Sequence, residues 1–119
     1  DAISKGVVVT SDLKFIIAQR SDSEEWDAPG GHMQEGEEAP FAFFREIKEE
    51  LGIEVEEVQF LDMLETTWKS ITKDSFYFFG RINHSSDELE GIINLQWEVS
   101  DYLNHTSHTP KVMLVRRNA

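Results

Sequence analysis

The chain has 119 residues, 39% of them hydrophobic, and no cysteine. This length suits one compact domain with a single core, and the composition excludes disulfides, thiolate metal sites and cysteine nucleophiles. The formal net charge of −12 disfavours long nucleic acid as a partner, because such binding depends on lysine and arginine. The apolar runs VMLV and FYFF are too short to cross a bilayer, so we expect a soluble, cytoplasmic protein with no membrane partner.

The first half of the chain predicts two strands, a loop and a helix. ISKGVVVT and LKFIIAQR are rich in β-branched residues and are separated by Ser-Asp, which predicts two strands joined by a short turn. SDSEEWDAPGG is predicted to be a loop from its Ser, Asp, Pro and Gly content. Ala39–Leu51 follows a helical pattern, with Pro40 tolerable in the first turn and Gly52 as a stop after the end.

The second half predicts further strands. VEEVQFLDMLETTW and SFYFFGRI are both read as strands, and the second is apolar on both faces, which predicts cover on both sides. LQWEVSDYL predicts a strand that runs into a turn. PKVMLVRRNA fits either a helix that begins at Pro110 or a strand, and we favour the helix. Strands combined with one or two helices predict a layered α/β fold.

The predicted helix carries a cluster of like charges. At 100° per residue, Glu46, Glu49 and Glu50 fall within an arc of roughly 100°, next to the apolar stripe of the same helix. Their repulsion costs about 0.2–0.5 kcal/mol per pair, and a hard cation such as Mg²⁺ would relieve it. The alternative is a solvated acidic face with Arg45 and Lys48 as partners.

Residues 31–53 resemble the signature of the Nudix hydrolase family, in its MutT-like branch. The signature is G, five residues, E, seven residues, R-E, an aliphatic, one residue, E-E, one residue, G and an aliphatic. Its positions are met by Gly31, Glu37, Arg45, Glu46, Ile47, Glu49, Glu50, Gly52 and Ile53. The flanking QR, WDAPGG and QWEVSDYL also resemble the family, whereas Phe43 stands where the family often has a small residue against the sheet.

The resemblance implies an α/β/α sandwich with a mixed β-sheet, as a single Nudix hydrolase domain over residues 1–119. It also implies that Glu46, Glu49 and Glu50, with the backbone carbonyl of Gly30, hold Mg²⁺ or Mn²⁺ beside a pyrophosphate. Such a cation polarises phosphoryl oxygen and activates a bound water as nucleophile.

Other site residues follow from the same resemblance. Arg45 and Glu37 look like an ion pair that orients the helix and its loop, with simple surface charge as the alternative for Glu37. Arg20 and Gly31 are expected to contact substrate, Arg20 as a phosphate clamp. The alternative for Arg20 is a surface arginine at a strand end.

A carboxylate on a later loop is expected to add a metal ligand or a base. SSDELEGI offers Asp87, Glu88 and Glu90, and we expect Glu90 because it precedes Gly91 at a suitable distance from Trp97. A solvated loop is the alternative. The four histidines show no metal-ligand spacing with each other and are interpreted as surface or loop residues.

These features predict a Mg²⁺-dependent hydrolase of nucleoside diphosphate derivatives. Nucleoside and deoxynucleoside triphosphates are the favoured substrates, with a monophosphate and pyrophosphate as products, and we count Glu46, Glu50, Arg45 and Glu90 as the catalytic residues. The expected partner is a small nucleotide, and the protein is expected to be a monomer or homodimer. The alternative function is a catalytically silent Nudix module that senses a nucleotide.

Overall fold

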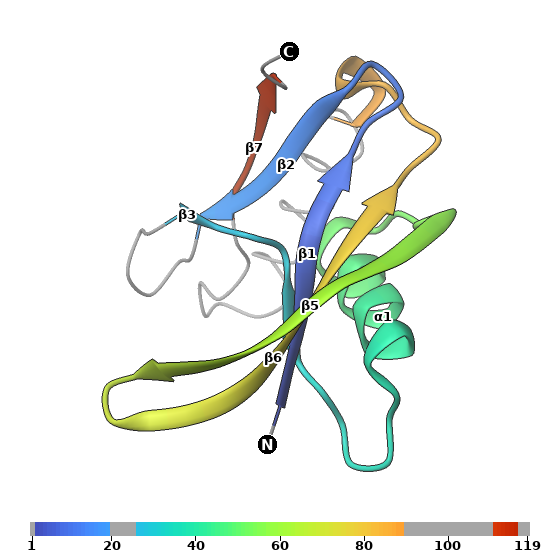
Figure 1. Cartoon of the computed structure of the whole chain (residues 1–119). Coiled ribbons are helices and arrows are strands. Elements are labelled where there is room, and N and C mark those ends of the chain that lie inside the picture. Colours follow the sequence, from blue (N-terminus) through green and yellow to red (C-terminus); the bar gives the residue numbers. More distant parts are fainter. Residues whose placement is uncertain (1, 20–25, 90–110, 117–119) are drawn as a thin grey trace, which may run out of the picture.

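The computed structural model describes residues 2–19, 26–89 and 111–116 (Figure 1). Its elements in chain order are β1 (Ala2–Val9), β2 (Lys14–Gln19), β3 (Trp26–Asp27), β4 (Gly30–His32), α1 (Ala39–Leu51), β5 (Glu57–Trp68), β6 (Ile71–Arg81) and β7 (Lys111–Arg116). The strands form one sheet in the order β3-β2-β1-β6-β5, with β4 paired to β1 and β7 paired to β2. The β1–β6 pair is parallel and the other pairs are antiparallel, so the predicted α/β fold with a mixed sheet is confirmed.

The strand β1 organises the sheet around the site. Strand β6 pairs with β1 along its whole length, so the other edge of β1 is left for β2 and β4. Strand β2 pairs with Val8 and Val9 at one end of that edge, and β4 pairs with residues 3–5 at the other end. The chain from β3 to β4 therefore fills the space where β1 and β2 diverge, and this brings Gly30 and Gly31 beside β1 (Figure 1).

The helix α1 has the predicted bounds. Pro40 lies in its first turn, and Gly52 ends it in the left-handed conformation at φ 69°, where its N–H donates to the carbonyl of Lys48. The buried Ser4 hydroxyl donates to the carbonyl of Ala39 at 2.8 Å, which fixes the first turn against β1. Within the part of the chain that the structure describes, no helix combines the length and apolar character needed to cross a membrane.

The favoured prediction of a terminal helix after Pro110 is wrong, and the strand alternative is right. Residues Lys111–Arg116 form β7, and each of the six pairs with a residue of β2. Since β2 offers a free edge of matching length, backbone pairing across the sheet decides a segment whose own pattern is ambiguous.

Two short strands interrupt the predicted loop. Trp26–Asp27 pairs with the end of β2, and Gly30–His32 pairs with the start of β1. Strands of two and three residues are too short to show a periodicity, so the local sequence predicted only a loop. Residues 21–25 of that loop and the strand predicted at LQWEVSDYL lie outside the described residues.

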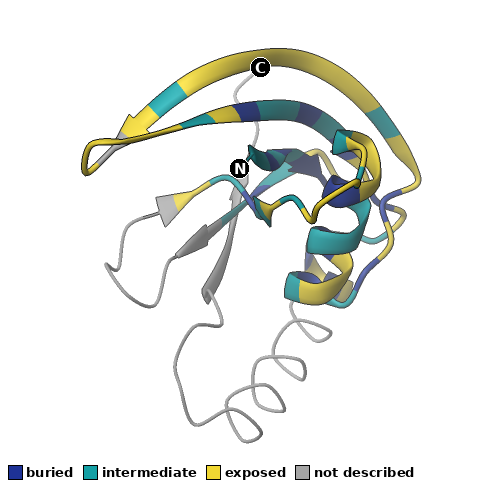
Figure 2. Cartoon of the chain, turned by 90° about the horizontal axis from the view of Figure 1, so that it is seen from below, coloured by how far each residue is buried: buried dark blue, intermediate teal, exposed yellow. Residues whose placement is uncertain are grey.

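The core lies between α1 and the sheet, as the burial colours show (Figure 2). It consists of Val8, Ile16, Phe43, Ile47, Leu51, Ile53, Val55, Phe78, Ile82 and Leu89. Phe43 is fully buried and stacks on Phe78 with ring centroids 5.4 Å apart. On the other face of β6, Tyr77 and Phe79 are partly buried, so the predicted cover is less complete there than on the α1 side.

Gly80 makes the room that the bulky Phe43 needs. A Cβ atom on Gly80 would lie 3.0 Å from Cε2 of Phe43 and 2.8 Å from Cγ1 of Val55, closer than ordinary carbon contacts. The departure from the family pattern at Phe43 is therefore matched by a glycine on the strand beneath it.

Gly80→Ala is expected to reduce the free energy of unfolding by about 1–3 kcal/mol, because the added methyl overpacks the core. Urea unfolding of Gly80→Ala, Phe43→Leu and the double variant checks this. The second change removes the ring, so the double variant should lose less than the sum of the two single changes. Additive losses would contradict the proposed match between the two positions.

Candidate functional site

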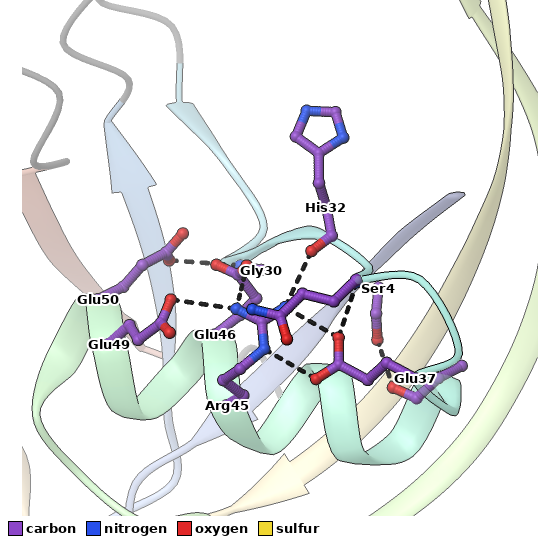
Figure 3. A network of polar contacts seen from close by, with 10 residues as sticks. Ser4, Gly30, His32, Glu37, Arg45, Glu46, Glu49 and Glu50 are labelled. Atoms are coloured by element: carbon purple, nitrogen blue, oxygen red, sulfur yellow. Dashed lines mark hydrogen bonds and ion pairs between the residues drawn. The ribbon is translucent and has the colours of Figure 1, made fainter. Parts of the chain in front are cut away.

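The candidate site lies where the polar side of α1 faces β4 (Figure 3). Gly31 is paired with Ser4 and Gly30 with Lys5, so both glycines are held by β1. From α1, Glu46 approaches Gly31 and Glu50 approaches Gly30. The helix periodicity thus presents carboxylates to two successive peptides of one strand.

Arg45 is the centre of the polar network (Figure 3). Its Nε and Nη2 donate to the two carboxylate oxygens of Glu37 at 2.8 and 2.9 Å. Its Nη1 donates to Glu46 at 3.0 Å and to Glu49 at 3.1 Å, and Nη2 also donates to the carbonyl of His32 at 3.0 Å. A guanidinium has five N–H donors, and these five acceptors use all of them. Arg45 is therefore fixed in one orientation against α1, the loop and β4.

Glu46 is much more enclosed than the neighbouring Glu49. Its side chain is 14% exposed, whereas that of Glu49 is 57% exposed. A Cβ atom on Gly31 would lie 2.5 Å from Oε2 of Glu46, so the carboxylate occupies space that only a glycine leaves open. Burial raises the pKa of Glu46, although the hydrogen bond and charge of Arg45 oppose that shift.

Glu50 connects the end of α1 to β4. Its Oε2 accepts a hydrogen bond from the N–H of Gly30 at 3.3 Å. Gly30 has a φ of 143°, in the region that glycine favours, and a Cβ there would lie 2.3 Å from the carbonyl oxygen of Ser4. The approach of β4 to both β1 and Glu50 therefore requires glycine at this position.

The chemical type of the clustered side chains suits a hard divalent cation, whereas their arrangement in this structure is directed at Arg45. One guanidinium faces the carboxylates of Glu37, Glu46 and Glu49, and Glu50 adds a fourth carboxylate nearby, so negative charge remains in excess. The four carboxylates present oxygen atoms, which Mg²⁺ prefers as ligands. Over residues 2–19, 26–89 and 111–116, no group of three or more carboxylate or imidazole side chains is arranged to hold a metal ion. Glu46 and Glu49 instead each turn an oxygen to Arg45.

Glu37 ties the loop before α1 to the helix. Besides Arg45, it accepts a hydrogen bond from the N–H of Gln34 at 2.9 Å. The bond from Arg45 is the main cause that lowers the pKa of Glu37 from 4.5 to about 2, and the bond from Gln34 adds to it. The stabilisation from this lowered pKa is complete above about pH 4.5 and is lost as the pH falls towards 2.

Glu37→Gln is expected to lower the melting temperature near neutral pH, because a neutral amide pairs less strongly with a guanidinium. The difference from wild type should shrink as the pH is lowered from about 5 towards 2, because the wild-type carboxylate is protonated in the unfolded chain near its ordinary pKa of 4.5 but in the folded protein only near 2. Thermal unfolding is measured across this pH range, and Glu35→Gln is the matched control because Glu35 is exposed. A difference that stays constant with pH would contradict the role of the Glu37 charge.

The remaining candidates from the sequence are Arg20, Glu90 and the two carboxylates that precede Glu90 on the same segment. Arg20 and Glu90 lie outside the described residues. Asp87 and Glu88 are exposed in the segment after β6, where Glu88 contacts His84 and Ser85. The roles expected for Arg20 and Glu90 stay predictions.

Some groups of the polar network were not predicted from the sequence, mainly because they take part through the backbone. The carbonyl of His32 accepts from Arg45, and the ring of the exposed His32 lies 3.3 Å from Nζ of Lys73. The N–H of Gln34 binds Glu37. The sequence pattern does not reveal which backbone groups accept or donate such bonds. The buried Ser4, whose hydroxyl bonds to α1, could be noticed in the sequence only as a polar residue on a predicted strand.

Comparisons with known proteins agree with this architecture. The NUDIX domain family model matches residues 2–117. An RNA pyrophosphohydrolase of Campylobacter jejuni subsp. doylei is 44% identical over 48 residues, which are 40% of this chain and 31% of that protein. A dihydroneopterin triphosphate diphosphatase of Escherichia coli K12 is 32% identical over 82 residues, which are 66% of this chain and 50% of that protein.

A solved structure shows the same fold. The NUDIX hydrolase from Nitrosomonas europaea superposes with a TM-score of 0.70 at 16% identity, covering 98% of this chain and 72% of that chain. The matches to the two curated relatives span half of those proteins or less. Since the family model covers nearly the whole sequence, this chain belongs to the NUDIX domain family.

Proposed function

We propose that this protein hydrolyses the pyrophosphate linkage of nucleoside diphosphate derivatives with the help of a divalent metal ion. The favoured substrates are nucleoside and deoxynucleoside triphosphates, and water added across one phosphoanhydride bond gives a monophosphate and pyrophosphate. The observation that carries the proposal is the set of α1 carboxylates held against Gly30 and Gly31 with one guanidinium among them.

Each residue has a proposed role. Glu46, Glu49, Glu50 and the Gly30 carbonyl are the proposed ligands of Mg²⁺ or Mn²⁺, with Glu90 as a further ligand or base. When bound, the cation would polarise phosphoryl oxygen and lower the pKa of a water molecule. Arg45 holds Glu46 and Glu49 in place, and Glu37 in turn holds Arg45. Arg20 is the proposed phosphate clamp.

The names of two relatives support the reaction class. Both the RNA pyrophosphohydrolase and the dihydroneopterin triphosphate diphosphatase are named for hydrolysis of a pyrophosphate linkage. The shared chemistry is therefore cleavage between phosphates, while the attached group differs between the two proteins. This supports the linkage as the target more strongly than it supports any particular nucleoside.

The direct test is a screen of nucleotide pyrophosphate compounds with Mg²⁺. Released pyrophosphate or monophosphate is converted to inorganic phosphate by an added pyrophosphatase or phosphatase and then measured. We expect turnover of triphosphates above that of dinucleotides and ADP-ribose. Tight nucleotide binding without turnover of any compound would contradict the enzyme and favour the nucleotide sensor.

Removal of divalent metal is expected to abolish turnover and lower the melting temperature. A cation that binds only the folded protein stabilises it, by about 2.7 kcal/mol when its concentration is 100 times the dissociation constant. Thermal unfolding and activity are measured with EDTA and then with excess Mg²⁺ or Mn²⁺. Activity that survives exhaustive chelation would contradict the proposed metal site.

A further inference from the structure

Lys5 is a cation in an acidic chain, and it is directed at the segment that carries Gly30. The side chain is 19% exposed, and its Nζ lies 2.9 Å from Oδ2 of Asp27. The same nitrogen lies over the ring of Tyr77, 5.8 Å from the centroid. Since the neighbouring Ser4 bonds to α1, strand alternation places Lys5 on the opposite face of the sheet from the helix.

The segment from Asp27 to Gly30 is attached to β1 at three points. Lys5 binds Asp27 through its side chain, the N–H of Gly6 donates to the carbonyl of Pro29 at 3.1 Å, and Lys5 is the strand partner of Gly30. Asp27 also accepts from the N–H of Ala28 at 2.8 Å, which sets the turn after β3. The one carboxylate of Asp27 thus links β1 to the backbone that leads into Gly30.

On its other side, Gly30 is held by α1 through the hydrogen bond from its N–H to Glu50. The Gly30 peptide is therefore held by Glu50 of the proposed metal site and by the attachments to β1, of which the Lys5–Asp27 link lies on the far face of the sheet. Metal ions of the Mg²⁺ class need ligand oxygens near fixed distances, so a small shift of this peptide weakens binding.

We propose that Lys5 and Asp27 are positioning residues that hold the Gly30 peptide in place for metal binding. The inference rests on the proposed function, because it takes the Gly30 carbonyl as a ligand. It adds a contribution from the face of the sheet opposite α1, made by an ion pair outside the signature residues 31–53.

A purely electrostatic effect of Lys5 and Asp27 on metal binding predicts a different result from a positioning role. Removing the positive charge of Lys5 would strengthen binding of a cation nearby, and removing the negative charge of Asp27 would weaken it. Positioning predicts that both changes weaken binding, because either change breaks the same link. The two variants together therefore separate geometry from electrostatics.

The experiment measures the dissociation constant of Mn²⁺ by calorimetry and electron paramagnetic resonance, without substrate, for Lys5→Met and Asp27→Asn. We expect a rise of about tenfold in both, as for the loss of groups that orient metal ligands. Lys5→Arg should keep an affinity close to wild type. Lys14→Met is the matched control, since its Nζ lies 3.8 Å from Asp12 in an ion pair that does not touch the 27–30 segment.

The outcomes are distinct. Wild-type affinity or tighter binding in Lys5→Met would overturn the inference, as would unchanged affinity combined with a raised KM, which would make the pair a substrate contact. Should Lys5→Met fail to fold, Lys5→Gln replaces it, because weakened Mn²⁺ binding in this neutral variant supports positioning whereas tighter binding would overturn it. A wild-type protein that binds no Mn²⁺ would overturn the proposed function itself and, with it, this inference.

Discussion

Replacing Glu50 with glutamine is expected to lower kcat by about two to four powers of ten while leaving the fold intact. The amide keeps the size of the side chain, and its oxygen can still accept the hydrogen bond from the N–H of Gly30. What is lost is one negative charge at the proposed cation site, and with it electrostatic or proton-transfer assistance to the transition state.

The metal-free Glu50→Gln protein should be as stable as wild type or more stable by a few tenths of a kcal/mol, because one like-charge repulsion on α1 is removed. The measurements are kcat and the melting temperature with and without Mg²⁺. Glu54→Gln is the control, because it removes the same charge from an exposed glutamate that follows α1 and contacts Lys48. A Glu50→Gln protein with near wild-type kcat would refute the assigned role.

Replacing Gly31 with alanine is expected to lower kcat by about two powers of ten through displacement of Glu46. The new Cβ would lie 2.5 Å from Oε2 and 2.6 Å from Cδ of Glu46. The carboxylate is the far end of a flexible side chain, so it moves more readily than the β4 backbone. A shift of about 1 Å in a catalytic group is enough for a loss of this size.

The matched control for Gly31→Ala is Gly36→Ala. Gly36 lies in the loop before α1 at φ 79°, and a Cβ there would have no atom within 4 Å. The control should therefore lose some stability from backbone strain but keep its kcat. Both variants are compared by kcat, Mn²⁺ affinity and melting temperature. Unchanged Mn²⁺ affinity and kcat in Gly31→Ala would show that Glu46 is not needed where the structure places it.

The sequence by itself determined the features that depend on local preferences. Pro40 and Gly52 mark the ends of α1, because proline suits the first turn of a helix and glycine adopts the left-handed conformation after the last. The 3.6-residue period placed Glu46, Glu49 and Glu50 on one side of the helix. The long strands were recognisable from runs of β-branched and aromatic residues.

Only the tertiary structure decided the features that depend on partners distant in the chain. The strands β3, β4 and β7 exist because β1 and β2 offer them edges, and their own residues do not specify pairing. The five acceptors of Arg45 include the carbonyl of His32, which no side-chain pattern reveals. The burial of Glu46 against Gly31 and the link from Lys5 to Asp27 also require the sheet to be assembled. Local backbone preferences act within a few residues, whereas the enclosure and orientation of a charged group depend on segments that only folding brings together.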